Sequence, residues 1–275
     1  MNTLFFQLYQ TLFSRRYLFK PNIALYKLAL RGLGVLNSDT AQSTGEPWLL
    51  QRLRKLHSDG QLSMKVIVDV GANDLAYGQT EFPQATIYAF EPQPESFVRL
   101  KQGAARNVVP IQAAVGDHQG TVDFWDFADR APRKTEQPTS QLATIHREVI
   151  EQLYHQPAKK YRVKMTTIDT FATENRIKHI DLLKIDAEGN ELAVLKGASG
   201  LLDANQIDII QFEFNEIHAY SRVFMKDFYE LLPEFEFFRL LPKGAVALGP
   251  YRPLTHEIFG FQNIVAVHKS THFHL

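Results

Sequence analysis

Short apolar runs alternate with amphipathic stretches along most of the chain. From residue 65 onward, continuous apolar runs rich in β-branched side chains lie at 65–70, 85–91, 108–117, 180–186 and 206–214. Runs of this kind are typical of strands that are buried on both faces of a parallel sheet. Helical patterns follow two of them, at residues 92–103 and 189–202. The alternation of strands and helices predicts an α/β fold with a doubly wound sheet.

Two more apolar runs close the chain, at 234–241 and 261–267, and a loop rich in glycine and proline separates them. Because no clear helical pattern lies between them, we predict a terminal antiparallel hairpin. Extended pieces at 120–127 and 161–171 flank a polar stretch, residues 129–160, which contains Pro132, Pro138 and Pro157. This stretch is longer than ordinary loops, which favours an insertion or a lid over a site. A plain surface insertion is the alternative.

Residues 1–62 have helical patterns, so we predict an N-terminal helical cap or extension at 1–62 and the main domain at 63–275. Near the start, an apolar run is too short to span a bilayer, and its basic residues follow it, unlike those of a signal peptide. Two alternatives stay open for residues 1–20: a helix packed on the domain, or an interfacial helix that contacts a membrane surface. The apolar residues of this run follow the helical period at Leu4, Phe5, Leu8, Tyr9, Leu12 and Phe13.

Composition narrows the possible classes of protein. Hydrophobic residues make up 45% of the chain, which is enough for one large domain with a full core. The 30 basic residues balance the 30 acidic ones, and no basic stripe with interleaved aromatic residues is present, so we expect no nucleic-acid partner. The absence of cysteine excludes disulfides, thiolate-bound zinc and thiol catalysis. We expect a cytoplasmic protein with a small-molecule partner, and the sequence does not fix the oligomeric state.

Acidic residues stand at or near the end of each predicted strand. In open α/β sheets, ligands bind beyond the carboxyl ends of the strands, and a purely structural sheet has no need of acids along that edge. The pattern therefore predicts a binding cleft bordered by these acids, which are Asp69, Glu91, Asp117, Asp186 and Glu213.

The turn after the first strand, VDVGANDLAYG, resembles a nucleotide-binding turn with most of its glycines missing. Gly71 allows a close backbone approach, and Asn73 can adopt the left-handed conformation in place of a second glycine. One glycine followed by the acidic Asp74 makes a poor cradle for a pyrophosphate. We therefore expect a cofactor that carries an amino acid and a sulfonium group, and a nicotinamide-dependent oxidoreductase is the disfavoured alternative. Glu91 lies 22 residues after Asp69, where it can accept hydrogen bonds from ribose hydroxyls, and Asp117 can accept one from an adenine amino group.

The most concentrated chemistry lies in KIDAEGNE, residues 184–191, and in EFNEIH, residues 213–218. Lys184 and Asp186 share one face of a strand, so Lys184 can hold the Asp186 carboxylate ionised, or form a merely structural ion pair. His218, Asp186 or Glu213 can act as a general base. Asp186, Glu213 and Asn215 can alternatively hold a divalent cation such as Mg²⁺, which we do not favour.

Several of these segments, in this order along the chain, resemble the FkbM family of S-adenosylmethionine-dependent methyltransferases. The resemblance covers about residues 65 to 267 and rests most specifically on KIDAEGNE, together with VIVDVGAN, AFEPQPESF, AAVGD, TTIDTF and FQNIVAV. It implies a seven-stranded sheet with a reversed last strand, as in class I (Rossmann-like) methyltransferases. It also implies methyl transfer from S-adenosylmethionine, usually to a hydroxyl oxygen of a sugar, polyketide or similar natural product.

The resemblance also implies roles for individual residues. Asp186 would lie beside the methionine end of the cofactor and the acceptor, and Ser140, in PTSQL, would lie near the cofactor. Apart from the resemblance, the acceptor pocket is expected near Tyr220, Phe224, Tyr251 and His256, because these residues lie in the late loops of the chain. The expected cofactor contacts are Asp69, Gly71, Ala72, Asn73, Glu91, Pro92, Asp117, Ser140 and Asp186.

The chain departs from the family at one point. The family often continues GAN with a glycine and an aromatic residue, whereas this chain has Asp74 and Leu75. The departure keeps a second hypothesis open, namely a non-catalytic cofactor-binding or scaffold protein with the same fold.

Overall fold

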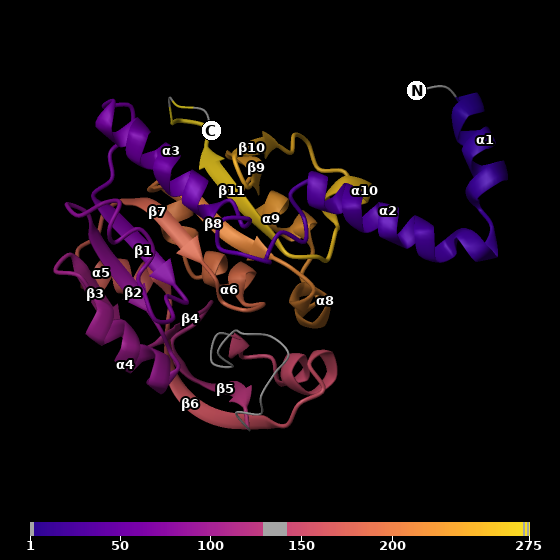
Figure 1. Ribbon diagram of the computed structural model, residues 1–275. Coiled ribbons are helices and arrows are strands. Elements are labelled where there is room, and N and C mark those ends of the chain that lie inside the picture. The colour runs from indigo at the N-terminus through magenta and orange to yellow at the C-terminus, as the bar shows by residue number, and fades with distance from the viewer. Residues whose placement is uncertain (1–2, 129–141, 272, 274) are drawn as a thin grey trace.

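A computed structural model describes residues 3–128, 142–271, 273 and 275 of the chain. Its centre is an eight-stranded sheet with the order β10-β9-β11-β8-β7-β1-β2-β3 (Figure 1). Strands β3, β2, β1, β7 and β8 are mutually parallel, and β11 runs antiparallel to both β8 and β9. The strands are β1 (Val66–Val70), β2 (Thr86–Phe90), β3 (Val108–Ile111), β7 (Ile180–Ile185), β8 (Ile207–Phe214), β9 (Phe235–Leu241), β10 (Gly244–Ala247) and β11 (Gln262–His268).

The predicted doubly wound α/β sheet with a reversed last strand is confirmed, but the strand count is eight rather than seven. The additional strand is β10, which forms an antiparallel hairpin with β9 at the edge of the sheet. Its four residues are half-buried or exposed, unlike those of the central strands, which are largely buried. The closing strands β9 and β11 do pair antiparallel, as predicted, although β10 lies between them in sequence.

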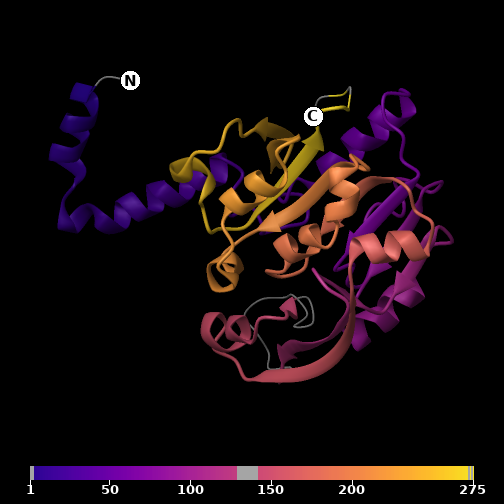
Figure 2. The ribbon, with the colours of Figure 1, turned by 180° about the vertical axis from the view of Figure 1, so that it is seen from behind.

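Helices cover both faces of this sheet (Figures 1 and 2). One face packs on buried side chains of α5, α6, α7 and α9, and the other on α3 and α4. Covering both faces explains why the central strands are apolar along their whole length, and in β7 every residue is buried. The helices are α3 (Glu46–Ser58), α4 (Pro94–Gly103), α5 (Ile168–Glu174), α6 (Glu191–Lys196), α7 (Ser199–Asp203), α8 (Ile217–Ser221), α9 (Met225–Leu231) and α10 (Pro253–His256).

A second, three-stranded sheet with the order β4-β6-β5 lies beyond the main sheet. Its strands are β4 (Ala114–Val115), β5 (Gly120–Phe127) and β6 (Ala158–Thr166), and a π-helical turn, η3 (Val149–Leu153), precedes β6. Phe124, Val163 and Met165 contribute to a small core of its own. The run predicted as one strand at 108–117 is thus divided, because β3 belongs to the main sheet and β4 to the second one. Residues 129–141 of the predicted insertion at 129–160 lie outside the described residues, so its role as a lid stays a prediction.

The chain begins with helices α1 (Thr3–Phe13) and α2 (Phe19–Gly32), joined by a 3-10 turn, η1 (Arg16–Leu18). These helices project away from the rest of the molecule (Figures 1 and 2). No residue of α1 is buried, so α1 is not packed on the domain as the first alternative required. None of the helices in the described part of the chain has the length and hydropathy needed to cross a membrane.

Helix α3 differs from the two helices before it, because Leu49, Leu53 and Leu56 are fully buried against the main sheet. Part of the predicted extension at 1–62 therefore contributes to the core of the predicted domain at 63–275. The boundary between the two stays a prediction.

Candidate functional site

The carboxyl ends of β1, β2, β7 and β8 border a cleft of about 700 Å³. This volume is within the range of sites for small molecules and cofactors, which is roughly 300–1,000 Å³. The second sheet forms the opposite wall through β4, β5 and the segment before β6. The lining residues are Ser38, Val70, Gly71, Asn73, Glu91, Pro92, Ala113, Ala114, Val115, Phe124, Leu142, Ala143, Ile145, Tyr154, Gln156, Asp186, Ala187, Glu188, Asn190, Glu213, Asn215, Glu216, Ile217 and Phe261.

The turn after β1 is built around Gly71. The amides of Gly71 and Ala72 both donate to the carbonyl oxygen of Phe90 at 2.9 Å, which ties the end of β1 to the end of β2. Gly71 has φ +81°, and a Cβ atom at this position would lie 1.8 Å from the carbonyl oxygen of Asp186. The glycine is therefore required by the close approach of β1 and β7, and not primarily by a ligand as the sequence led us to expect. Ala72 is buried and does not border the cleft.

Asn73 adopts the left-handed conformation, with φ +51°, as predicted. Its amide donates to Oε2 of Glu91 at 2.9 Å, and the amide of Gln93 donates to Oε1 of Glu91 at 2.7 Å. Burial raises the pKa of Glu91 to about 7, although these two amide donors act in the opposite direction. Oδ1 of Asn73 is buried and has no hydrogen-bond partner among the described residues. Asn73 and Glu91 therefore present hydrogen-bond acceptors to the cleft.

Asp69 lies in β1 and is not among the residues that border the cleft. Its Oδ2 accepts a hydrogen bond from the amide of Tyr77 at 2.7 Å, and only 2% of the residue is exposed. Burial raises its pKa to about 6, and the Lys184 ammonium group acts against this increase. Asp69 therefore stabilises the turn after β1 through this hydrogen bond, without bordering the cleft.

Asp186, Glu188 and Glu213 bring three carboxyl groups to one side of the cleft. The pKa of each is raised, first by burial and then by the neighbouring carboxylates, against the effect of Lys184. Together with Glu91 and Glu216, five acidic residues line the cleft, and the described lining contains no lysine, arginine or histidine. The cleft is thus rich in hydrogen-bond acceptors and is lined by several carboxyl groups whose ionised forms a bound positive charge would favour.

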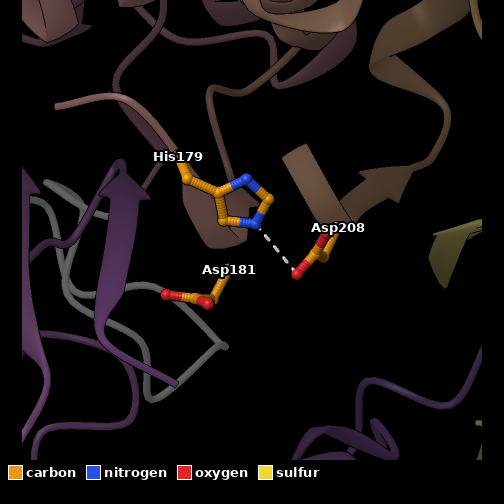
Figure 3. A group of neighbouring side chains, drawn as sticks. All are labelled: His179, Asp181 and Asp208. Carbon is orange, nitrogen blue, oxygen red and sulfur yellow. Dashed lines mark ion pairs between the residues drawn. The ribbon is translucent and has the colours of Figure 1, made fainter. Parts of the chain in front are cut away.

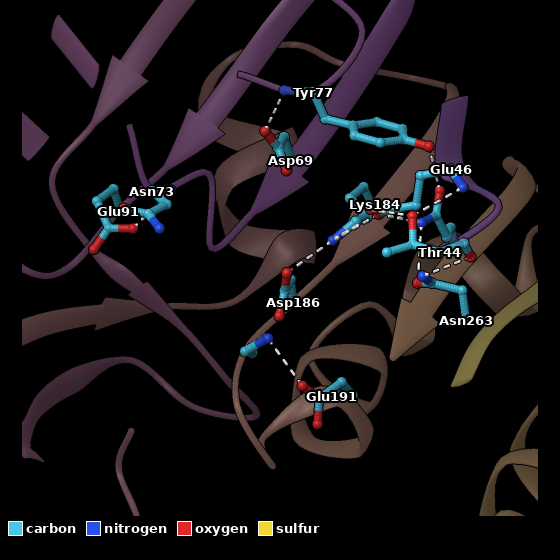
Figure 4. A network of polar contacts seen from close by, with 12 residues as sticks. Thr44, Glu46, Asp69, Asn73, Tyr77, Glu91, Lys184, Asp186, Glu191 and Asn263 are labelled. Carbon is cyan, nitrogen blue, oxygen red and sulfur yellow. Dashed lines mark hydrogen bonds and ion pairs between the residues drawn. The ribbon is translucent and has the colours of Figure 1, made fainter. Parts of the chain in front are cut away.

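Lys184 lies directly behind Asp186 and connects the cleft to helix α3 (Figure 4). Its Nζ lies 3.1 Å from Oδ2 of Asp186 and 3.7 Å from Oε1 of Glu46, at the first position of α3. Burial would lower the pKa of this ammonium group, but the surrounding carboxylates raise it above its usual value, so Lys184 stays charged. Only 5% of its side chain is exposed, and it does not border the cleft.

A chain of hydrogen bonds extends this network across the sheet (Figure 4). Gln211 accepts from the hydroxyl of Tyr77 at 2.6 Å and donates to Glu46 at 2.7 Å and to Asn263 at 3.3 Å. Asn263 in turn donates to the carbonyl oxygen of Thr44 at 3.3 Å. The network therefore links β1, β7, β8 and β11 to the start of α3.

His218 is fully buried and does not reach the cleft. Its Nε2 lies 3.1 Å from Oε2 of Glu191, which is also buried. Glu191 accepts hydrogen bonds from the amides of Ala187 and Gly189, at 2.9 and 3.0 Å. Burial alone would raise the pKa of Glu191, but His218 and the amide donors lower it. The pair thus holds the turn at 187–190 in shape, which disagrees with the expectation of His218 as a base in contact with substrate.

Other expected residues also lie elsewhere. The side chain of Asp117 is 50% exposed, does not border the cleft, and lies 2.7 Å from Nδ1 of His118. Ser140 lies outside the described residues. None of the residues expected at the acceptor pocket is part of the described lining, and these are Tyr220, Phe224, Tyr251 and His256.

The two unusual residues of the turn lie outside the cleft as well. Nε of Arg99 in α4 donates to Oδ1 of Asp74 at 2.7 Å. Leu75 is 60% exposed. Neither residue is among those that line the cleft.

The sequence reasoning missed several lining residues. Phe124, Tyr154 and Gln156 come from the second sheet and the segment before β6, which no strand-end rule identifies. Asn190 donates from Nδ2 to the carbonyl oxygen of Val115 at 2.9 Å and so joins the two walls. Its position inside KIDAEGNE was the one available indication.

A second group of titratable residues lies near the amino ends of β7 and β8, away from the cleft, and consists of His179, Asp181 and Asp208 (Figure 3). Nε2 of His179 lies 3.0 Å from Oδ2 of Asp208. Oδ2 of Asp181 accepts hydrogen bonds from the amides of Lys65 and Val66, at 2.8 and 2.7 Å. The group thus anchors the start of β1, and no further observation points to a ligand there.

Comparison with known proteins adds to this geometry. The sequence profile described as the Methyltransferase FkbM domain matches residues 69–241, which is more than half of the chain. A hexuronic acid methyltransferase, AglP, from Haloferax volcanii is 27% identical over 204 residues, covering 71% of this chain and 75% of that protein. A 2-O-methyltransferase, NoeI, from Sinorhizobium fredii is 22% identical over 184 residues, covering 65% of this chain and 75% of that protein.

Among solved structures, the chain is similar to a crystal structure of methyltransferase FkbM from Methylobacillus flagellatus. The sequence identity is 12%, the TM-score is 0.39, and the alignment covers 74% of this chain and 43% of the other.

Proposed function

The chain belongs to the FkbM methyltransferase family, and on this basis we propose that it methylates a hydroxyl oxygen of a saccharide, polyketide or similar small natural product, with S-adenosylmethionine as the methyl donor. The alternative of a nicotinamide-dependent oxidoreductase is therefore wrong. The proposal of a hydroxyl acceptor is supported by the names of two relatives, a hexuronic acid methyltransferase and a 2-O-methyltransferase.

One observation carries the choice of cofactor, namely five acidic residues and no basic residue in the described lining of the cleft. A pyrophosphate requires backbone amides or cationic side chains, and this lining would repel it. S-adenosylmethionine carries a positive sulfonium, an ammonium group and ribose hydroxyls, but no phosphate. The lining suits such a ligand because acceptors and negative charge face its donors and positive charge.

Individual residues of the cleft fit this group. The unpartnered Oδ1 of Asn73 can accept one hydrogen bond, and the carboxylate of Glu91 has acceptor capacity left after its two amide bonds. We assign these two residues to the hydroxyl and amino groups of the cofactor, with Gly71 and Pro92 as neighbouring walls of the site. Asp69 supports the turn, and Ala72 is a buried neighbour.

Bound S-adenosylmethionine supplies a methyl group that is activated by its sulfonium sulfur. The protein must then orient an acceptor hydroxyl and remove its proton. We propose Asp186 as the base, because it borders the cleft and burial raises its pKa towards that of an effective proton acceptor. Lys184 is a positioning residue that fixes Oδ2 of Asp186. Glu213 is the second candidate for the base, since it lines the same side of the cleft.

The metal alternative with Asp186, Glu213 and Asn215 stays the less favoured one. All three residues line the cleft, but the ammonium group of Lys184 lies 3.1 Å from Oδ2 of Asp186. This cation occupies one face of the carboxylate and would repel a divalent ion there.

A cytoplasmic location of the protein also stays a prediction.

The non-catalytic alternative depended on Asp74 and Leu75. Because the first pairs with Arg99 and the second is exposed, both outside the described lining, their presence leaves the cleft intact. This favours the catalytic function.

Calorimetry and a transfer assay test the proposal together. We expect S-adenosylhomocysteine to bind and NAD not to bind, and we expect methyl-labelled cofactor to label a hexuronic acid or another saccharide in an acceptor screen. Turnover should be unchanged by EDTA, and loss of turnover that Mg²⁺ restores would support the metal alternative. Failure of S-adenosylhomocysteine to bind would reject the proposed cofactor site.

The variant Asp186→Asn tests the proposed base. It should lower turnover by about 10²–10⁴-fold, because an amide cannot accept the proton, while S-adenosylhomocysteine still binds. Asp208→Asn, at the amino end of β8 and away from the cleft, is the matched control and should retain full turnover. If Asp186→Asn is fully active and Glu213→Gln is not, then Glu213 is the base.

A further inference from the structure

The first two helices expose an unusual amount of apolar surface. We define the N-terminal arm as residues 3–33, which comprise α1, η1 and α2. Tyr17 is 76% exposed and Leu4 is 75% exposed. The exposed large apolar residues of the arm are Leu4, Phe5, Phe6, Leu8, Tyr9, Leu12, Phe13, Tyr17, Phe19, Ile23, Leu25, Tyr26, Leu28 and Leu33. Contiguous apolar surface of this extent marks an interaction site.

The distribution of these residues in α1 is that of an interfacial helix. At 100° per residue, the polar residues Thr3, Gln7, Gln10 and Thr11 share a narrow arc, and the apolar residues occupy the remaining, wider arc. A seam for one partner helix is narrower than this arc. A wide apolar arc on a short helix suits immersion in the boundary between lipid headgroups and acyl chains.

Helix α2 combines apolar residues with a basic stripe. Lys20, Lys27 and Arg31 are spaced i, i+7 and i+11, so they share one face, while Leu25 and Leu28 lie on another. Lysine and arginine stems can lie along an apolar surface while their charged ends reach the headgroups. The stripe therefore adds to the apolar residues rather than interrupting them.

Charge separates the arm from the rest of the chain. Residues 1–38 contain five basic residues and no acidic one. Since the whole chain has 30 of each, residues 39–275 contain 25 basic and 30 acidic residues. Arg31 pairs with Asp39, and the other basic residues of the arm, Arg15, Arg16, Lys20 and Lys27, have no ionic partner within the described part of the chain.

We propose that the N-terminal arm docks the protein on an anionic lipid bilayer. The apolar arc of α1 and the apolar residues of α2 enter the interface, and the basic residues contact acidic headgroups. A pair of arms from two copies would instead bring like charges together, which disfavours self-association through the arm. The negative charge of the remaining chain keeps it from lying flat on the same surface.

The structure of the arm supports docking as a unit. Nδ2 of Asn22 in α2 donates to the carbonyl oxygen of Phe13 at 3.0 Å, and the hydroxyl of Tyr9 donates to Oδ1 of Asn22 at 3.2 Å. These bonds join the end of α1 to the start of α2. Directly after the arm, the amide of Leu36 donates to the carbonyl oxygen of Phe261 at 2.7 Å, and Phe261 and Ser38 border the cleft.

Vesicle flotation of the full chain tests this proposal. One set of vesicles contains phosphatidylcholine alone, and the other contains about one third phosphatidylglycerol. The wild type should bind the anionic vesicles and bind the neutral ones at least about tenfold more weakly. Leu8→Glu/Leu12→Glu should weaken binding to anionic vesicles by at least about a hundredfold. Arg15→Gln/Arg16→Gln/Lys20→Gln should weaken it by at least about thirtyfold and reduce its salt dependence.

Matched substitutions outside the arm serve as controls. Leu254→Glu changes a leucine that is 92% exposed, and Lys101→Gln/Lys178→Gln/Lys243→Gln removes the same number of charges from exposed positions. Both should bind like the wild type. Because every substituted side chain is exposed, or half-buried at most, the variants should keep the wild-type unfolding temperature.

Three results would overturn the proposal: no binding of the wild type to anionic vesicles, equal binding to both compositions, or wild-type binding by the arm variants. Light scattering distinguishes the remaining case. If the wild type does not float but is a dimer that Leu8→Glu/Leu12→Glu converts to a monomer, the arm is an interface between copies and the bilayer proposal is wrong.

Discussion

At the scale of single residues, Gly71 allows the turn after β1 to lie close to the backbone that follows β7. Its φ is +81°, and a Cβ atom at this position would lie 1.8 Å from the carbonyl oxygen of Asp186. Any side chain must separate β1 from β7 at the point where the cleft begins. The residue is thus a structural requirement of the site, whatever ligand occupies it.

Substitution of this glycine by alanine distinguishes the strain of the positive φ from the overlap with Asp186. Gly71→Ala should reduce the free energy of unfolding by about 3 kcal/mol or more, from strain and overlap together. Gly60→Ala is the matched control, with φ +72° and nothing within 4 Å, and should cost only about 1 kcal/mol. Urea denaturation measures both, and equal losses would show that overlap with Asp186 is unimportant.

Glu91 predicts a dependence of stability on pH. Burial raises its pKa from the usual 4.5 to about 7 in the folded protein, so the folded state binds more protons than the unfolded state between these values. Stability should therefore be fully present below about pH 4.5 and fall by about 3 kcal/mol as pH rises through 7. Asp69, with its pKa raised to about 6, acts in the same direction.

The measurement is the free energy of unfolding without ligand from pH 5 to 8. Glu91→Gln should remove the part of the decrease that Glu91 contributes, because the amide does not titrate, and leave the part that the other buried carboxyl groups contribute. An unchanged pH profile in this variant would assign the decrease to other groups.

The sequence predicted some site residues and not others for a clear physical reason. Asn73 and Glu91 follow directly from the rule that ligands lie beyond strand ends, and both border the cleft. Asp117 and His218 satisfy the same rule, yet one faces solvent and the other pairs with Glu191. The position of a residue along a strand limits where its backbone lies, but not the direction of its side chain.

At the scale of secondary-structure elements, α3 shows which contacts a local sequence pattern can indicate and which it cannot. Leu49 and Leu53 of this helix are fully buried, in line with the helical pattern of the segment. Nothing in the pattern indicates that Glu46 reaches Lys184 across 138 positions of sequence. Such contacts depend on the order of the strands, and a single sequence does not contain that order in its local pattern.

Strand boundaries show the same limit. The central strands were predictable because both faces are covered, which makes their runs continuously apolar. The short β4 and β10 were not, since β4 has two residues and β10 is only partly buried. The second sheet, which forms a wall of the cleft, therefore could not be derived from apolar periodicity.

At the scale of the whole molecule, the arm and the remainder of the chain should behave as independent parts. None of the described residues before Leu30, which are residues 3–29, is buried, so removal of residues 1–28 should change the unfolding temperature by no more than about 2 °C. Leu53→Ala, in the fully buried face of α3, is the comparison and should lose about 3 kcal/mol. Differential scanning calorimetry distinguishes them, and a comparable loss on truncation would show that the arm packs on the remaining chain.

The segment that directly follows the arm, residues 36–38, contacts Phe261 and reaches the border of the cleft, and this connection has a kinetic consequence. An enzyme held on a bilayer by a support that continues into its site encounters surface-bound acceptors by lateral diffusion, in two dimensions instead of three. Turnover on such acceptors would then scale with their number per unit area of lipid. Diluting the acceptor with inert lipid, at a constant total amount of acceptor, would slow the enzyme. Diluting the whole suspension would leave the turnover rate unchanged as long as the protein stays bound.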